Sequence, residues 1–266
     1  MIGQQKLIND IYRIIDNNTF PRFCILAGAK GSGKRLLSAY ISEKLNCEHY
    51  IALTDVKIDT IRDIITQAYK ITESTLYVIP DADGMSVAAK NSLLKITEEP
   101  PNKAYFIMTV CDINGMLDTI RSRAQIFMME DYTPEQIAEY KVTNYGEADI
   151  DIFKNICTTP GEVDILAKSG VAKFYDYVKL VVDNIVNVQL ANAFKITSKV
   201  ALKDNDEGYD LQLFWKCFIA ICKEDMERYG EAILSTSYYL SQTRIKGINK
   251  SGLMDMWIMD MREKMK

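Results

Sequence analysis

A glycine-rich loop that ends in lysine is the segment best suited to chemistry. Residues 28–34 read Gly-Ala-Lys-Gly-Ser-Gly-Lys and fit the pattern G-x-x-x-x-G-K. Such glycines let backbone N–H groups face a phosphate, the following helix adds positive potential, and the lysine reaches the outer phosphates. The alternative is a glycine-rich turn that binds nothing. The predicted nucleotide-binding residues are Gly28, Gly31, Ser32, Gly33, Lys34 and Arg35.

The positions that would hold Mg²⁺ carry unsuitable residues. A working loop has Ser or Thr after the lysine, and its hydroxyl ligates the ion. Here that residue is Arg35, which cannot ligate a cation. A second strand, Leu76 to Ile79, should be followed by one carboxylate that orients Mg²⁺ and another that polarises water. Pro80 takes the first of these places, so we assign no metal ligand.

Apolar periodicity predicts the elements that must position this loop. A helical stripe covers residues 7–15, a buried strand covers 23–27 directly before the loop, and a second helical face covers 36–45. Asp59 and Ser86 are expected to be helix N-caps. Strands that alternate with helices imply an α/β fold with a parallel sheet covered on both faces. The remaining predicted strands are Tyr50–Leu53, Leu76–Ile79, Tyr105–Val110 and Ile126–Met129.

The second half of the chain is expected to be helical, without a convincing strand. Thr133-Pro134-Glu135-Gln136 predicts a helix start, with Thr as N-cap, Pro at the first position and Gln closing a capping box. Longer helical stripes begin near residue 171, and residues 204–208 form a polar break between two of them. We predict an α/β domain at 1–131, a small helical domain at 132–170 and an all-α domain at 171–266.

Composition excludes several classes of function. The 266 residues carry a formal net charge of −4, so any DNA contact must be local or shared with partners. The N-terminus, residues 1–17, is unlike a signal peptide, and no apolar run could span a membrane, so we expect a cytoplasmic protein. The six cysteines form no C-x-x-C pair and His49 is the only histidine, which argues against zinc and His-rich metal sites.

Residues 82–125 carry a family resemblance. They include Ala-Asp-Gly-Met at 82–85, Leu-Leu-Lys-Ile-Thr-Glu-Glu-Pro-Pro at 93–101 and Thr-Ile-Arg-Ser-Arg at 119–123. These motifs, with Ile-Gly-Gln at 2–4 and Val-Lys-Ile-Asp-Thr-Ile-Arg at 56–62, resemble the AAA+ clamp-loader subunits of DNA polymerase III. The likeness covers residues 1–131, and Pro160-Gly161 fits the family's lid. It implies a P-loop AAA+ domain, a helical lid at 132–170 and an oligomerising collar at 171–266.

Departures from the family pattern favour its non-hydrolysing delta-prime subunit. The zinc module that bacterial relatives often insert is missing, because the segment from Cys47 to Asp55 is too short to hold it. The site departures are Arg35 for the loop Ser/Thr, Pro80 for the Mg²⁺-holding Asp, Asp81 for the catalytic Glu, Cys111 for the γ-phosphate sensor and Val163 for the lid Arg.

The resemblance also implies a role in trans. Arg123 falls where the family has an arginine finger, which reaches a neighbouring subunit's ATP site. The alternative is a surface arginine before a strand. A solvated helix face and its salt bridges, rather than a site, are expected from Lys90, Lys95, Glu98 and Glu99. ATP or ADP would be bound without hydrolysis and without zinc. The implied partners are the other subunits of a hetero-pentamer and, indirectly, the sliding clamp and primer–template DNA, with no membrane.

The sequence leaves two other functions open. An active clamp-loader motor ATPase would need the Mg²⁺ ligands that this sequence lacks. A nucleotide-binding module of another AAA+ machine, such as a DNA-repair protein, would share the fold, although the 94–101 run and the Ser-Arg motif argue against it.

Overall fold

The computed structural model describes residues 2–202, 208–243, 245 and 247–266, and the chain forms two compact units, Met1–Thr133 and Pro134–Lys266. The polar break predicted at 204–208 lies outside the described residues except for Gly208. The elements of the first unit are α1 (Gln5–Asp16), β1 (Phe23–Ala27), α2 (Lys34–Lys44), β2 (His49–Ala52), α3 (Ile58–Ala68), β3 (Thr75–Ile79), η1 (Ala82–Gly84), α4 (Val87–Ser92), α5 (Leu94–Glu98), β4 (Ala104–Val110), η2 (Ile113–Gly115), α6 (Asp118–Arg121) and β5 (Gln125–Met128).

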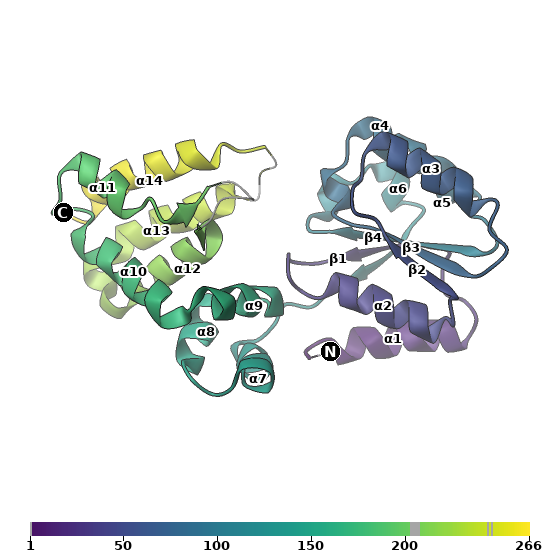
Figure 1. The fold of residues 1–266 in the computed structure, drawn as a ribbon, viewed down its shortest axis with the longest axis horizontal. Coiled ribbons are helices and arrows are strands. Elements are labelled where there is room, and N and C mark those ends of the chain that lie inside the picture. Colours follow the sequence, from purple (N-terminus) through teal and green to yellow (C-terminus); the bar gives the residue numbers. More distant parts are fainter. Residues whose placement is uncertain (1, 203–207, 244, 246) are drawn as a thin grey trace. The chain divides into compact units, whose positions relative to one another are not determined.

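The first unit is built on a parallel sheet with the strand order β2-β3-β4-β1-β5 (Figure 1). Strand β1 lies between β4 and β5, so that Ala27 is opposite both Val110 and Met128. The chain leaves β1 through α2 to the far edge of the sheet and later crosses β1 again between β4 and β5. Ligands of open parallel sheets bind where the strand order reverses in this way, outside the carboxyl ends of the strands.

Helices cover both faces of this sheet (Figure 1). On one face α1 and α2 bury Ile11, Leu37 and Ile41 against every second residue of the central strands, including Leu26 and Val78. On the other face α3, α4 and α5 pack against the alternate residues of the same strands. All five residues of β1 and of β3 are buried, as continuous apolar strands in a doubly covered sheet should be.

The predicted parallel α/β fold is confirmed, with strand ends displaced by one residue at most. The expected N-cap at Ser86 is also correct, because its hydroxyl accepts a hydrogen bond from Ala89 N at 3.2 Å. The expected cap at Asp59 is wrong. Helix α3 begins at Ile58, so Asp59 lies in its first turn, where a carboxylate suits the helix dipole. The aspartate that binds this helix start is Asp55, which accepts from Thr60 Oγ1 at 2.7 Å.

The second unit is mainly helical. Its core contains Trp215 and Trp257, both fully buried, and the Trp257 indole donates to Thr236 Oγ1 at 2.9 Å. The expectation that no strand follows residue 133 is wrong, because two-residue strands pair in parallel; segments this short show no periodicity in sequence. The elements are α7 (Pro134–Tyr145), α8 (Ile150–Ile156), α9 (Pro160–Ser169), α10 (Val171–Asn184), α11 (Leu190–Ile196), β6 (Val200–Ala201), β7 (Tyr209–Asp210), α12 (Leu211–Cys222), η3 (Lys223–Asp225), α13 (Met226–Gln242) and α14 (Lys250–Lys264).

A partly buried ion pair joins the two regions predicted as lid and collar. Lys216 Nζ on α12 lies 2.5 Å from Glu162 Oε1 on α9, and it also donates to Thr158 Oγ1 at 2.9 Å. The division at residue 170 stays a prediction, since residues 134–266 form one compact unit. None of the helices in the described part of the chain is long and apolar enough to cross a bilayer.

Lys90 was expected on a solvated helix face, and that expectation is wrong. Its side chain is buried, and Nζ donates to the backbone oxygens of Asp83 at 2.9 Å and Gly115 at 2.6 Å. The helical spacing gave no sign of this, because the two acceptors belong to the 3₁₀ turns η1 and η2 that follow β3 and β4. Lys90 therefore holds two loops at the carboxyl edge of the sheet together.

We predict that Lys90→Met lowers the free energy of unfolding by about 2 kcal/mol, because it removes a buried ammonium group that donates to two backbone carbonyl groups in partly buried hydrogen bonds. Lys95→Met is the matched control. Lys95 is exposed and lies 5.2 Å from the Tyr69 ring, so its loss should change stability by about 1 kcal/mol at most. Urea unfolding followed by far-ultraviolet circular dichroism measures both values, and equal losses in the two variants would contradict the assigned role of Lys90.

Candidate nucleotide-binding site

The glycine-rich loop connects the carboxyl end of β1 to the amino end of α2. Gly33, the N-cap residue of α2, has φ 92°, in the left-handed region that favours glycine. Its helix has no side-chain cap and no acidic residue in the first turn. The first N–H groups of a helix have no partner within the helix, so the start of α2 can donate to an anion.

Lys34 fills the centre of the loop. Its Nζ donates to Gly28 O at 2.6 Å and to Ala29 O at 2.8 Å, and lies 3.8 Å from Cys111 Sγ. Burial lowers the pKa of Lys34, while the nearby Cys111, Asp81 and Asp83 act in the opposite direction. The lysine thus connects the loop to the end of β4, and a phosphate that entered would accept from an ammonium group already in place.

Ser32 is the second polar group inside the loop. Its hydroxyl is buried, and in the part of the chain that the structure describes it has no hydrogen-bond partner. Its carbonyl oxygen accepts from the Tyr132 hydroxyl at 2.7 Å. Tyr132 lies 100 residues further along the chain and no local pattern in the sequence indicated it. The loop is therefore fixed from outside, while its serine hydroxyl is buried without a partner among the described residues.

The carboxylates after β3 are arranged for structure rather than for metal binding. Pro80 follows the strand, and Asp81 adopts a left-handed conformation (φ 45°) with its N–H donating to Thr109 Oγ1 at 3.2 Å. Asp83 Oδ2 accepts from the backbone N–H groups of Cys111 at 3.1 Å and Asp112 at 3.0 Å. Among the described residues, no group of three His, Cys, Asp or Glu side chains could hold a metal ion.

The structure brings together the loop, Asp81 and Cys111, but it does not bring Arg123 to them. Arg123 follows α6 and precedes β5, and therefore lies at the amino ends of the strands. The five residues of β1 separate the two edges by about 16 Å, beyond the reach of an arginine side chain. Val163 is fully buried in the second unit.

Arg123 is held by neighbours at its own edge. Its Nη2 lies 2.9 Å from Glu98 Oε1, and Nη1 donates to Thr119 O at 2.8 Å. The side chains of Arg123 and Glu98 are 38% and 55% exposed, so solvent screens this pair. Glu98 is exposed and ion-paired, as expected for a residue of a solvated helix face and its salt bridges, but the sequence did not indicate that its partner is Arg123.

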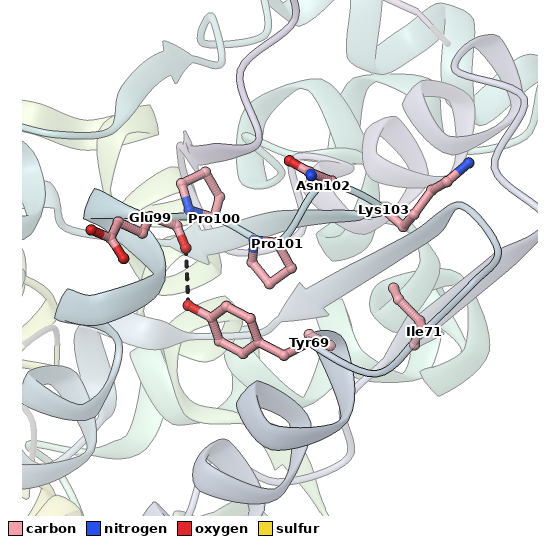
Figure 2. A pocket seen from close by; sticks show the side chains of 8 residues that line it. Tyr69, Ile71, Glu99, Pro100, Pro101, Asn102 and Lys103 are labelled. Carbon is pink, nitrogen blue, oxygen red and sulfur yellow. Dashed lines mark hydrogen bonds between the residues drawn. The ribbon is translucent and has the colours of Figure 1, made fainter.

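A shallow pocket of about 370 Å³ lies at this amino edge, next to the Glu98 position (Figure 2). The Tyr69 hydroxyl donates to Glu99 O at 2.9 Å, which fixes the ring against the Pro100-Pro101 turn (Figure 2). This pocket belongs to a different edge of the sheet from the glycine-rich loop and shares no residue with it. The turn that it supports ends the segment carrying Glu98.

The strand order and the loop define the class of this protein. A parallel five-stranded sheet with a glycine-rich loop of the G-x-x-x-x-G-K pattern after its internal strand β1, followed by a helical region, is the architecture of AAA+ proteins. The chain is related to the clamp-loader subunits of DNA polymerase III. Residues 49–133 match the family described as "DNA polymerase III, delta subunit".

Curated relatives support this relationship. The chain is 25% identical over 169 residues to DNA polymerase III subunit gamma of Buchnera aphidicola (subsp. Schizaphis graminum), covering 53% of this chain and 47% of that protein. It is 25% identical over 166 residues to subunit tau of Bacillus subtilis, covering 52% and 30%. It is 21% identical over 165 residues to subunit delta' of the same organism, covering 51% and 50%. The chain thus spans half or less of each of these relatives.

Solved structures share the fold. A DNA polymerase III gamma subunit-related protein of Thermotoga maritima has a TM-score of 0.56 at 16% identity, with 97% of this chain and 99% of that chain covered. RuvB of the same organism has a TM-score of 0.54 at 18% identity, with 98% and 88% covered. Both helical regions are included in these matches, so the two-unit AAA+ arrangement of elements extends over nearly the whole chain.

The start of the loop leaves no room for a side chain at Gly28, whereas Gly230 has free space around it, so alanine substitutions at the two positions should change stability in opposite directions. A Cβ on Gly28 would lie 2.6 Å from Met129 Cβ, so Gly28→Ala should destabilise the protein by about 1–3 kcal/mol. A Cβ on Gly230, inside α13, meets nothing within 4 Å, and Gly230→Ala should stabilise by about 0.5–1 kcal/mol. Differential scanning calorimetry should show melting shifts of opposite direction, and an unchanged melting temperature for Gly28→Ala would disprove the close contact.

Proposed function

We propose that this chain is a non-hydrolysing, delta-prime-like subunit of a clamp loader. It would support loading of the sliding clamp onto primed DNA and supply Arg123 to the ATP site of a neighbouring subunit. One observation carries the proposal: the arginine lies at the opposite sheet edge from the chain's own phosphate loop, on a half-exposed surface, while that loop lacks the residues that hold Mg²⁺.

The absence of hydrolysis follows from charge. Phosphoryl transfer needs cations that neutralise the charge developing on the γ-phosphate, and P-loop enzymes place Mg²⁺ there through a hydroxyl and an acidic side chain. Arg35 and Pro80 occupy those two positions, and the Asp83 carboxylate is already bonded to two backbone N–H groups. ATP or ADP would then be held at the loop without turnover.

Release of Arg123 to a neighbour would require little free energy. An exposed ion pair such as Glu98–Arg123 contributes about 0–1 kcal/mol, because solvent screens it. A guanidinium fork in a water-excluded phosphate site makes charge-assisted hydrogen bonds that are stronger. The pair with Glu98 therefore holds the side chain at the surface of the free subunit without preventing its transfer to a γ-phosphate.

The second unit offers a surface for assembly. Leu234 and Tyr238 lie one helical turn apart on α13 and are 74% and 60% exposed, and Met256 and Met259 on α14 are 60% and 53% exposed. Other large apolar residues of the same two helices, Tyr239, Met254 and Trp257, are buried in the core of the unit and are not available for assembly. We propose that the exposed residues contact the other subunits of a cytoplasmic hetero-pentamer, through which the chain acts on clamp and primer–template DNA.

An active ATPase subunit is the second candidate, because the curated relatives include gamma and tau subunits. It needs Mg²⁺ at a loop whose hydroxyl and acidic positions are Arg35 and Pro80. The two candidates differ in which residue of this chain matters, Lys34 or Arg123, and the two predictions below separate them.

We predict that the isolated chain does not turn over ATP, because the site cannot neutralise the γ-phosphate charge. Steady-state phosphate release should equal that of Lys34→Ala at every protein concentration, also with clamp and primed DNA added. Turnover above this baseline that disappears in Lys34→Ala would show an active motor site instead.

We further predict that Arg123→Ala lowers the ATPase rate of the reconstituted complex and leaves folding and assembly intact. An arginine finger contributes about 10³–10⁵ in related phosphoryl transfers, and the loss for the whole complex should be smaller because one of several sites is affected. Arg123→Lys should restore little, since a point charge does not replace the planar fork.

Arg121→Ala is the matched control for this experiment. Arg121 belongs to the same turn, but it pairs with Asp118 and donates to Asn114 Oδ1 within its own loop. Its loss should change the rate little, as should Lys34→Ala in this chain. Full activity of Arg123→Ala together with an inactive Lys34→Ala complex would favour the motor candidate.

A further inference from the structure

Mg²⁺, which AAA+ proteins ordinarily bind together with the nucleotide, does not fit the residues of this site. The loop position that should offer a hydroxyl is Arg35, which can only donate hydrogen bonds. Asp83 Oδ2 already accepts from the N–H groups of Cys111 and Asp112, so that among the described carboxylates near the loop only Asp81 has no such hydrogen bonds. A cation at Arg35 would also repel a metal ion.

The other features of the loop still indicate an anion. The start of α2 has no side-chain cap and no acidic residue, and its first two residues, Lys34 and Arg35, are both cations at the positive end of the helix dipole. Like charges at this end are unfavourable unless an anion is present. Independently of the helix, the buried Ser32 hydroxyl has no partner among the described residues and points toward the loop start, 3.3 Å from where a Cβ on Gly28 would lie.

We propose that the loop binds a nucleoside diphosphate or triphosphate without a divalent cation, and that the Arg35 guanidinium supplies the positive charge that Mg²⁺ brings in other members of the class. This inference rests on the nucleotide binding included in the proposed function. It goes beyond that function by assigning the form of the ligand, a metal-free polyphosphate, and the residue that selects it.

The position of Arg35 suits this role. Its backbone is fixed, because its carbonyl oxygen accepts from Ser38 Oγ at 2.7 Å and from the Tyr50 hydroxyl at 3.3 Å. Its side chain is exposed, and within the described part of the chain the guanidinium makes no ion pair or hydrogen bond. A planar fork with five donors can bind two phosphate oxygens at once, which a bound Mg²⁺ also does.

The local charge is sufficient for a polyphosphate. Lys34 lies inside the loop, where its Nζ donates to Gly28 O and Ala29 O, and the exposed Lys30 belongs to the same loop. Lys30, Lys34 and Arg35 thus give the loop and the start of α2 three cations, and the nearby carboxylates of Asp81 and Asp83 balance part of that charge. Mg²⁺ chelated by the phosphates would have to share this space with Arg35.

The test is equilibrium binding of a fluorescent N-methylanthraniloyl ADP to the full chain, once with excess EDTA and once with excess MgCl₂. We expect equal affinities within about threefold in the two buffers. Arg35→Thr replaces the cation with the hydroxyl that other P-loops use. It should bind about tenfold or more weakly in EDTA, because a charge-assisted contact is lost, and Mg²⁺ should restore part of that affinity.

Two further variants complete the experiment. Arg35→Lys keeps the charge and the fold and should retain metal-independent binding, with an affinity between those of the wild type and Arg35→Thr. Arg62→Thr makes the same change on the exposed face of α3, where the Arg62 side chain is 63% exposed, and should bind as the wild type does.

Three outcomes would overturn the inference: wild-type affinity that rises about tenfold or more with Mg²⁺, binding by Arg35→Thr in EDTA equal to that of the wild type, or no wild-type binding in either buffer. The role in trans fails on a different result, an unchanged rate in complexes that contain Arg123→Ala. Loss of nucleotide binding here would leave that part of the proposed function in place.

Discussion

The direction of the strands is the constraint on which the other features of the first unit depend. In a parallel sheet every carboxyl end lies at one edge and every amino end at the other. Because β1 lies between β4 and β5, the loop after β1 is flanked by the ends of those two strands, which places Cys111 beside Lys34. The same polarity places Arg123, just before β5, at the opposite edge. The topology therefore separates the glycine-rich loop from Arg123, which is the arrangement that the proposed function requires.

At the carboxyl edge, hydrogen bonds to the backbone have taken over positions where a working enzyme needs free ligands. Asp83 binds the N–H groups that follow β4, Thr109 binds the N–H of Asp81, and Lys90 joins the turns after β3 and β4. These bonds pair polar groups that are partly buried or exposed, and together they hold the loops after β3 and β4 in place. Each also removes an oxygen from the set that could ligate a cation. The loops of this edge are therefore joined by hydrogen bonds although the residues that hold Mg²⁺ in a working site are missing.

The sequence predicted the sheet well because β1, β3 and β4 are continuous apolar segments buried on both faces, and such segments are readable without knowledge of tertiary contacts. It also placed the glycine-rich loop correctly, since the strand, loop and helix are consecutive. It failed where one side chain serves a distant segment. The charge pattern of its helix predicted an exposed Lys90, but the side chain donates hydrogen bonds to the backbone of two separate turns. The Tyr132 hydroxyl donates to the carbonyl oxygen of Ser32, which lies 100 residues earlier in the chain. The cap of α3 was misassigned because Asp55 acts from outside the helix.

The two arginines at opposite edges differ in the way their charge is balanced, and this difference bears on their roles. Arg123 has an anionic partner, Glu98, and a carbonyl partner, so the free subunit carries it without an uncompensated charge at that edge. Arg35 has no such partner among the described residues and stands at the positive end of α2 beside Lys34. A partnered, exposed arginine can be exchanged from one anion to another at little expense. An unpartnered arginine next to a buried lysine favours an anion that stays bound, and a nucleotide that is not hydrolysed is such an anion. The structure of the first unit therefore suits a subunit whose own ligand is static and whose chemistry takes place in its neighbour.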